Sequence, residues 1–85
     1  MPNTTSPSPA VERIPMACIR PSAQRCYYGA QHLELLTDRM RIHGLVNPIV
    51  VRRATGGYEI VDGLRRWWAA RFLGWRSIDA KILPA

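Results

Sequence analysis

The chain has 85 residues, of which 47% are hydrophobic and 21% are charged, so it has room for one small globular domain and is neither disordered throughout nor a coiled coil. Lys and Arg number 12 against 6 acidic residues, a net charge of +6, and Lys81 is the only lysine. Because a guanidinium grips phosphate at two points, this excess predicts a polyanionic partner: nucleic acid, nucleotide or an acidic protein. The alternative is that arginine usage reflects the base composition of the genome.

The N-terminal residues 1–10 are rich in Pro, Ser and Thr and carry no charged side chain, which predicts a disordered leader. The folded domain is therefore expected over residues 11–85. Apolar side chains recur through residues 11–19 on both sides of Pro15, and a proline within such a pattern indicates an edge strand. A loop is expected from residue 21 to residue 29.

A first helix is predicted over residues 32–43, followed by Gly44. Glycine just after the last turn is typical of a left-handed cap, in which Leu45 would contact Met40. The apolar side chains of this helix fall on one face at i, i+3 and i+7 spacing: Leu33, Leu36 and Met40.

The second half of the chain predicts a hairpin, a helix and a strand. Residues 49–53 and 58–61 are rich in β-branched side chains and are separated by a polar, glycine-containing turn, which indicates a hairpin. A helix over about 63–73 ends at Gly74, and alternation over residues 78–82 predicts a last strand. The order strand, helix, strand, strand, helix, strand indicates a small α/β domain without internal repeats.

The junction between the hairpin and the second helix has the features of an anion-binding site. The first turn of a helix exposes backbone N–H groups and a partial positive charge, and Gly63 would let a ligand approach the backbone. Arg65 and Arg66 add two guanidiniums to that turn, where the helix dipole disfavours cations unless an anion offsets them. Asp62 is expected to offset part of this cost as an N-cap. The alternative is a simple Asp62 cap with Arg65 and Arg66 as solvated surface.

The second helix also carries two apolar faces, more than one sheet contact can bury. One face consists of Leu64, Trp67 and Trp68, and the other of Ala69, Phe72 and Leu73. Small Ala69 suits close approach to the sheet, so three uses of the tryptophan face stay open. They are closure of the core against the N-terminal segment, a contact with a protein partner or second copy, and base stacking beside Arg71.

No metal site, membrane span or secretory signal is expected. Cys18 and Cys26, with His32 and His43, match no compact zinc spacing, so two reduced thiols in a cytoplasmic protein are predicted. No stretch approaches the roughly 18 apolar residues of a membrane span. The N-terminus lacks a basic region followed by an apolar one.

Four segments in order resemble the N-terminal domain of ParB proteins. Residues 14–25 resemble its opening, and residues 33–51 resemble its first helix and the G-L-x-x-P-I-x-V stretch. Residues 58–66 and then 69–74 resemble the block y-x-I-x-x-G-E-R-R-x-x-A-A-x-x-x-G. The likeness spans residues 11–83 and implies the ParB/sulfiredoxin fold: a small α/β domain with a mixed four-stranded sheet and two helices.

The resemblance implies a nucleotide-binding domain, because in ParB proteins this domain binds CTP, with Mg²⁺ as the accompanying ion. By position, the residues implied to hold the phosphates are Gly63, Leu64, Arg65, Arg66 and, from the first loop, Arg25. Those implied to lie on the base side are Gly44, Asn47 and Pro48.

Departures from the family pattern bear on catalysis. Leu64 stands where ParB has the glutamate associated with metal and CTP hydrolysis, so binding without chemistry is expected and no catalytic or metal-binding residue is assigned. Sulfiredoxin needs a cysteine at that same position, which makes its activity unexpected here. An alternative is a nuclease or phosphotransferase of the superfamily, for which Glu59 and Asp62 would have to share a metal. Alternation along a strand predicts that these two carboxylates face opposite sides.

The resemblance also suggests a cellular role and partners. A ParB-like domain acts in plasmid or chromosome partition or related DNA-linked regulation, which implies a nucleoid- or plasmid-associated bacterial protein. ParB proteins continue into DNA-binding helices and a dimerisation segment, so this chain is either a fragment or a free-standing relative. DNA contact is expected through such a further domain or through the basic surface. The Trp67/Trp68 face gives a third possibility, an interaction module with a protein partner or a homodimer.

Overall fold

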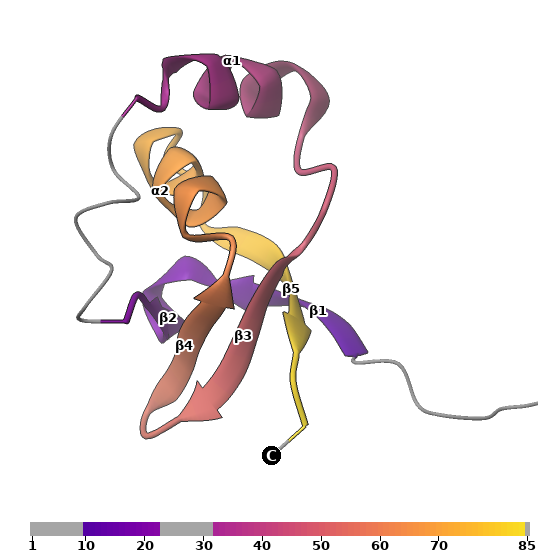
Figure 1. The fold of residues 1–85 in the computed structure, drawn as a ribbon, viewed down its shortest axis with the longest axis vertical. Helices are drawn as coiled ribbons and strands as arrows, with labels where there is room; N and C mark the ends of the chain where they lie inside the picture. Colours follow the sequence, from indigo (N-terminus) through magenta and orange to yellow (C-terminus); the bar gives the residue numbers. More distant parts are fainter. Residues whose placement is uncertain (1–9, 23–31, 85) are drawn as a thin grey trace, which may run out of the picture.

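The computed structural model of the protein describes residues 10–22 and 32–84, and the fold is shown in Figure 1. The predicted leader lies outside these residues except for Ala10, where the first strand begins; Arg25 and Cys26 also lie outside them. The elements in chain order are β1 (Ala10–Pro15), the short 3₁₀ turn η1 (Met16–Cys18), β2 (Ile19–Arg20), α1 (Glu34–His43), β3 (Ile49–Ala54), β4 (Gly57–Asp62), α2 (Leu64–Phe72) and β5 (Ser77–Ile82).

The strands form one mixed sheet in the order β1-β5-β3-β4-β2. β1 with β5 and β3 with β4 are antiparallel, whereas β3 with β5 and β2 with β4 are parallel. The predicted class, a small α/β domain with a mixed sheet and two helices, is confirmed, but the sheet has five strands and not four. The predicted single edge strand over 11–19 divides at Pro15, and η1 carries the chain so that β2 pairs with β4 at the opposite edge.

The local predictions for the helices and the hairpin are confirmed with small shifts. α1 begins at Glu34, two residues later than expected, and ends at His43, with Gly44 as its C-cap, whose N–H donates to the Met40 carbonyl at 2.8 Å. Gly44 has the expected positive φ of +74, but its ψ of −164 lies outside the left-handed helical region, so the cap is not of the predicted kind. The hairpin strands are each extended by one residue or two, and Gly56 takes a positive φ in the turn. Neither α1 nor α2, the helices of the described residues, is long and apolar enough to cross a membrane.

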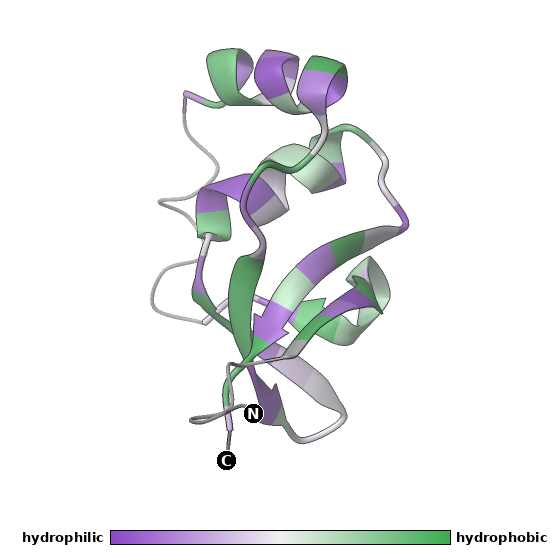
Figure 2. Cartoon of the chain, turned by 90° about the vertical axis from the view of Figure 1, so that its right-hand side faces the viewer, coloured by the Kyte–Doolittle hydropathy of each residue, from purple (hydrophilic) through white to green (hydrophobic). Residues whose placement is uncertain are grey.

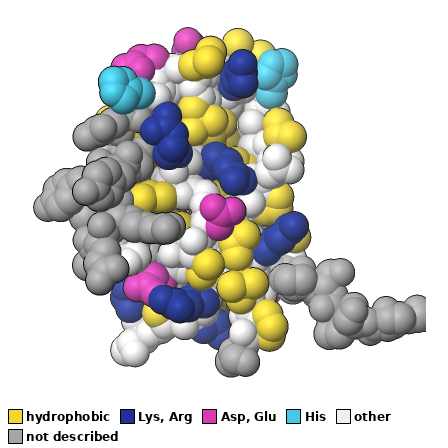
Figure 3. Space-filling view, viewed as in Figure 1, with side chains coloured by type: hydrophobic (Ala, Val, Ile, Leu, Met, Phe, Trp, Pro, Cys, Tyr) yellow, Lys and Arg dark blue, Asp and Glu magenta, His cyan; other side chains and the backbone are white. Residues whose placement is uncertain are grey.

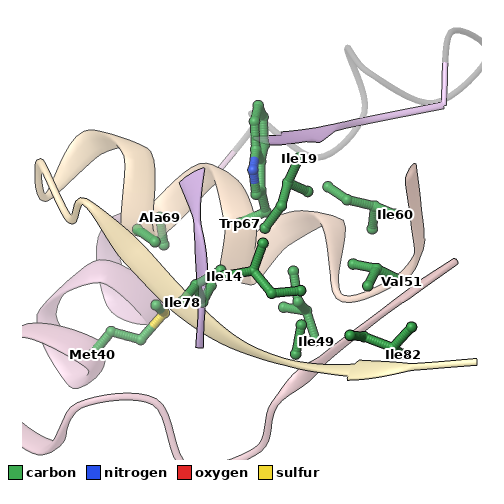
Figure 4. Close-up of a cluster of buried hydrophobic side chains, with 12 residues drawn as sticks. Ile14, Ile19, Met40, Ile49, Val51, Ile60, Trp67, Ala69, Ile78 and Ile82 are labelled. Carbon is green, nitrogen blue, oxygen red and sulfur yellow. The ribbon is translucent and has the colours of Figure 1, made fainter. Parts of the chain in front are cut away.

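The core lies between α2 and the sheet. Its centre is formed by β3 and β5, whose inward side chains Ile49, Val51, Ile78 and Ala80 are almost completely buried. Trp67 of α2 is only 3% exposed and lies beside Ile19 of β2 (Figure 4). α1 packs against α2, on its far side from the sheet (Figure 1), and mixes hydrophobic with hydrophilic residues (Figure 2).

The prediction of two separate apolar faces on α2 is wrong. The buried side chains of α2 are Trp67, Ala69 and Ala70. Trp67 belongs to the expected tryptophan face, Ala69 to the other expected face and Ala70 to neither. Phe72, expected on the second face, is 67% exposed. Trp67 and Ala70 are neighbours at i, i+3 spacing, so the face turned to the sheet runs between the two expected ones. Because Trp67 belongs to the core, the Trp67/Trp68 pair does not form an exposed interaction surface.

A substitution at Gly57, the first residue of β4, tests how closely η1 packs on the hairpin. A Cβ placed on Gly57 would collide with the backbone carbonyl of Cys18, an atom that cannot rotate away. We expect Gly57→Ala to lower the free energy of unfolding by about 1–3 kcal/mol, measured by urea denaturation. The neighbouring control Thr55→Ala, at an exposed position of the turn, should stay within about 0.5 kcal/mol of wild type. Equal effects from the two substitutions would contradict this packing.

Candidate functional site

One pocket of about 860 Å³ lies where α1, the segment after it, the end of β4 and the start of α2 meet. The structure brings together there six residues that the sequence singled out from two distant segments: Gly44, Asn47, Gly63, Leu64, Arg65 and Arg66. Pro48 does not line the pocket, although its carbonyl accepts a hydrogen bond from Arg66. Arg25 lies outside the described residues, so its expected role stays a prediction.

Gly63 fixes where α2 begins. It is the N-cap of α2 in a left-handed conformation, with φ +96 and ψ +24. A Cβ at this position would lie 2.7 Å from Cγ2 and 2.9 Å from Cβ of Ile49, a side chain buried at the centre of the core. The glycine is therefore required both by its conformation and by its packing on β3. Sequence reasoning had not found this packing on Ile49.

Asp62 does not cap α2, contrary to the sequence prediction. The N-cap is Gly63, which makes no side-chain cap hydrogen bond, and the first turn of α2 contains no acidic residue. The earliest N–H groups of a helix have no partner within it, and Gly63, Leu64 and Arg65 line the pocket. Asp62 also lines this pocket and is the acidic residue among the described residues that do so. The start of α2 thus presents its partial positive charge to the pocket.

Arg65 and Arg66 are not simply solvated surface. Nη2 of Arg65 donates to the carbonyl of His32 at 2.7 Å. Nη1 of Arg66 donates to the carbonyls of Asn47 at 2.8 Å and Pro48 at 3.1 Å. These charge-assisted bonds offset the unfavourable placement of two cations at the positive end of a helix dipole.

An arginine and a histidine in the pocket were missed by sequence reasoning. Arg39 and His43, four residues apart on α1, line it together with Leu36 and Met40. The four positions follow i, i+3, i+4 and i+7 spacing, so the apolar face predicted for this helix also carries these two side chains. Figure 3 shows Lys and Arg side chains gathered over α2 and below α1 on this side of the molecule.

Glu59 and Asp62 do not form a common metal site. Glu59 accepts bonds from Nη2 of Arg52 at 2.6 Å and from its Nε at 3.0 Å, across the β3–β4 pair. Asp62 lines the pocket. The pairing of β4 with β3 shifts register between Ile60 and Asp62, so the regular alternation that predicted opposite faces for Glu59 and Asp62 is interrupted there. Among residues 10–22 and 32–84 no group of three His, Cys, Asp or Glu side chains is close enough to hold a metal ion.

Comparison with known sequences identifies a family. The ParB N-terminal domain matches residues 2–84. The nucleoid occlusion protein of Halalkalibacterium halodurans is 39% identical over 74 residues, which cover 85% of this chain and 26% of that protein. The chromosome-partitioning protein Spo0J of Thermus thermophilus is 38% identical over 74 residues, covering 85% and 28%. The chain therefore spans about a quarter of the length of these relatives.

Solved structures agree with this match. The C-terminally truncated chromosome-partitioning protein ParB of Caulobacter crescentus, complexed with CTP-γ-S, superposes with a TM-score of 0.78 at 26% identity, over 89% of this chain and 45% of that one. Sulfiredoxin of Arabidopsis thaliana superposes with a TM-score of 0.78 at 31% identity, over 91% and 88%. With the sequence match over residues 2–84 and the same architecture, the chain belongs to the ParB N-terminal domain family.

Proposed function

We propose that the pocket binds a nucleoside triphosphate, with CTP as the preferred ligand. We further propose that the chain is the nucleotide-binding module of a protein acting in chromosome partition or nucleoid occlusion. The observation that carries this proposal is the convergence of three arginines and the N-terminus of α2 on one pocket. The likeness to a ParB protein complexed with CTP-γ-S supports the choice of ligand.

The α2 end of the pocket suits the triphosphate. Backbone N–H groups at a helix N-terminus and guanidinium side chains are the donors that phosphate oxygens prefer. Arg66 uses Nη1 for both of its carbonyl bonds, and its Nη2 and Nε make no hydrogen bond to the part of the chain that the structure describes. A guanidinium has five N–H donors in all, so Arg66 can keep its carbonyl partners and still donate to a phosphate.

The α1 end of the pocket suits the nucleoside. Leu36, Met40 and Leu45 give this part apolar surface, and Gly44 and Asn47 bring backbone groups to it. Apolar walls with a few fixed polar groups are typical of sites for small organic ligands, and about 860 Å³ lies in the usual range of roughly 300–1,000 Å³. The pocket is therefore large enough for a whole nucleotide.

The donor set also fits a magnesium ion carried with the nucleotide. Asp62 is the one carboxylate among the described residues that line the pocket. Mg²⁺ prefers oxygen ligands and is commonly held by one or two carboxylates together with substrate phosphates. Asp62 would hold the ion, which would reduce the repulsion between this carboxylate and the phosphates. Leu64, at the family's glutamate position, offers no oxygen from its side chain.

Binding of CTP is expected to depend on Arg65 and Arg66. We expect calorimetric titration with CTP and Mg²⁺ to show binding that Arg65→Ala/Arg66→Ala weakens by at least roughly tenfold, since a hydrogen bond to a charged group contributes about 1.5–3 kcal/mol. The matched control Arg52→Ala/Arg53→Ala removes the same two charges from the hairpin, away from the pocket. It should bind as wild type does.

Two outcomes would contradict this prediction. One is that neither CTP, ATP nor GTP binds to the wild-type chain. The other is that the two double variants bind CTP equally well, which would assign the affinity to net charge. Circular dichroism of each variant establishes that it is folded before titration.

The absence of a carboxylate at position 64 predicts binding without hydrolysis. We expect incubation of the chain with CTP and Mg²⁺ to release no more phosphate than nucleotide alone, measured with a colorimetric phosphate assay. Phosphate release that requires Mg²⁺ and disappears in Asp62→Asn would instead support the enzymatic alternative. DNA contact through a further domain or the basic surface stays a prediction.

A further inference from the structure

α1 is attached to the rest of the domain by little apolar burial. Met40 is its only buried side chain, and Leu35 and Ile42 are 63% and 73% exposed. Its main packing partner is α2 and not the sheet. A helix with so few buried contacts is expected to open more easily than the central strands. Yet α1 supplies Arg39, Met40 and His43 to the pocket, so the shape of the pocket depends on where this helix lies.

Arg65 and Arg66 bond to the chain on both sides of α1. Arg65 donates to the carbonyl of His32, two residues before the helix begins, at 2.7 Å. Arg66 donates to the carbonyls of Asn47 and Pro48, beyond the helix's C-terminal end, at 2.8 and 3.1 Å. Two consecutive residues in the first turn of α2 therefore bracket α1.

We propose that Arg65 and Arg66 are positioning residues that clamp α1 onto α2 and thereby hold the α1 wall of the pocket in place. Their contribution to ligand affinity then includes the arrangement of Arg39, His43 and the segment after α1, in addition to any contact with phosphate. The part of this proposal that concerns ligand affinity rests on the proposed function. The clamp itself rests only on the three hydrogen bonds and the sparse burial of α1.

Arginine-to-lysine substitutions separate the clamp from the charge. Lysine keeps the positive charge, but its ammonium nitrogen stands at about the position of the arginine Cζ, one bond short of the Nη atoms that donate to these carbonyls. Its flexible stem also lacks the rigid planar arrangement of donors, so the substitution is not conservative here. Arg65→Lys and Arg66→Lys should therefore weaken the attachment of α1 while leaving the net charge of the pocket unchanged. The control is Arg52→Lys/Arg53→Lys, in which two exposed arginines of β3 are changed in the same way.

The clamp is tested by amide hydrogen exchange of the full chain without nucleotide, followed residue by residue by NMR. We expect the amides of residues 37–44 to exchange about fivefold faster in each single variant than in wild type, the factor given by loss of one typical hydrogen bond. Amides of β3 and β5 should keep their wild-type rates. Unchanged rates in α1, or a uniform increase that includes β3 and β5, would overturn the proposal.

The effect on the pocket is tested by NMR titration with CTP and with cytidine, which has no phosphate. If the arginines position the pocket, affinity for both ligands falls by a similar factor in Arg66→Lys. If they only contact phosphate, affinity for CTP falls and affinity for cytidine is unchanged, and this result would overturn the positioning role in binding. If neither ligand binds the wild-type chain, the proposed function fails, and the exchange experiment still decides the existence of the clamp.

Discussion

The packing of Gly63 on Ile49 is the constraint on which the rest of the site depends. Ile49 is completely buried between α2 and the sheet, and the missing side chain of Gly63 lets the end of β4 lie directly against it. The left-handed conformation of the same glycine starts α2 at Leu64. Arg65 and Arg66 consequently stand beside the chain that flanks α1. A contact inside the core thus determines the geometry of a pocket at the surface.

The electrostatics of the pocket follow from that geometry. A helix N-terminus and three arginines would repel one another across a small space, and two features of the chain reduce this repulsion. Backbone carbonyls of His32, Asn47 and Pro48 accept bonds from two of the guanidiniums, and Asp62 lies at the pocket wall. The remaining positive potential is what an anionic ligand would meet. The same bonds join α1 to α2, so ligand recognition and local structure share the same side chains.

Much of the fold could be predicted from the sequence because its signals are local. Gly44 as a helix stop, the β-branched hairpin and the alternation in β5 each depend on neighbouring residues, and all are confirmed. The residues at the start of α2 were also found, because glycine followed by two arginines stands directly after a strand. The fifth strand was missed because β2 has only two residues and is defined by its pairing with β4. The predicted capping role of Asp62 was wrong because Gly63, which packs on Ile49, is the N-cap of α2 in place of Asp62. Arg39 and His43 were missed because the periodicity of α1 points only to its apolar side chains, and polar residues on the same face give no such signal.

The most direct test of the central claim, that the α2 end and the α1 end of this pocket receive one nucleotide, is a ¹⁵N–¹H NMR titration of the full chain with CTP and Mg²⁺. We predict that the largest shifts of amide signals occur at residues 63–66 and 44–47, the two segments that meet in the pocket. The amide signals of the exposed arginines of β3 should shift only slightly. Shifts spread evenly over the basic surface, or no shifts at residues 63–66, would contradict the account.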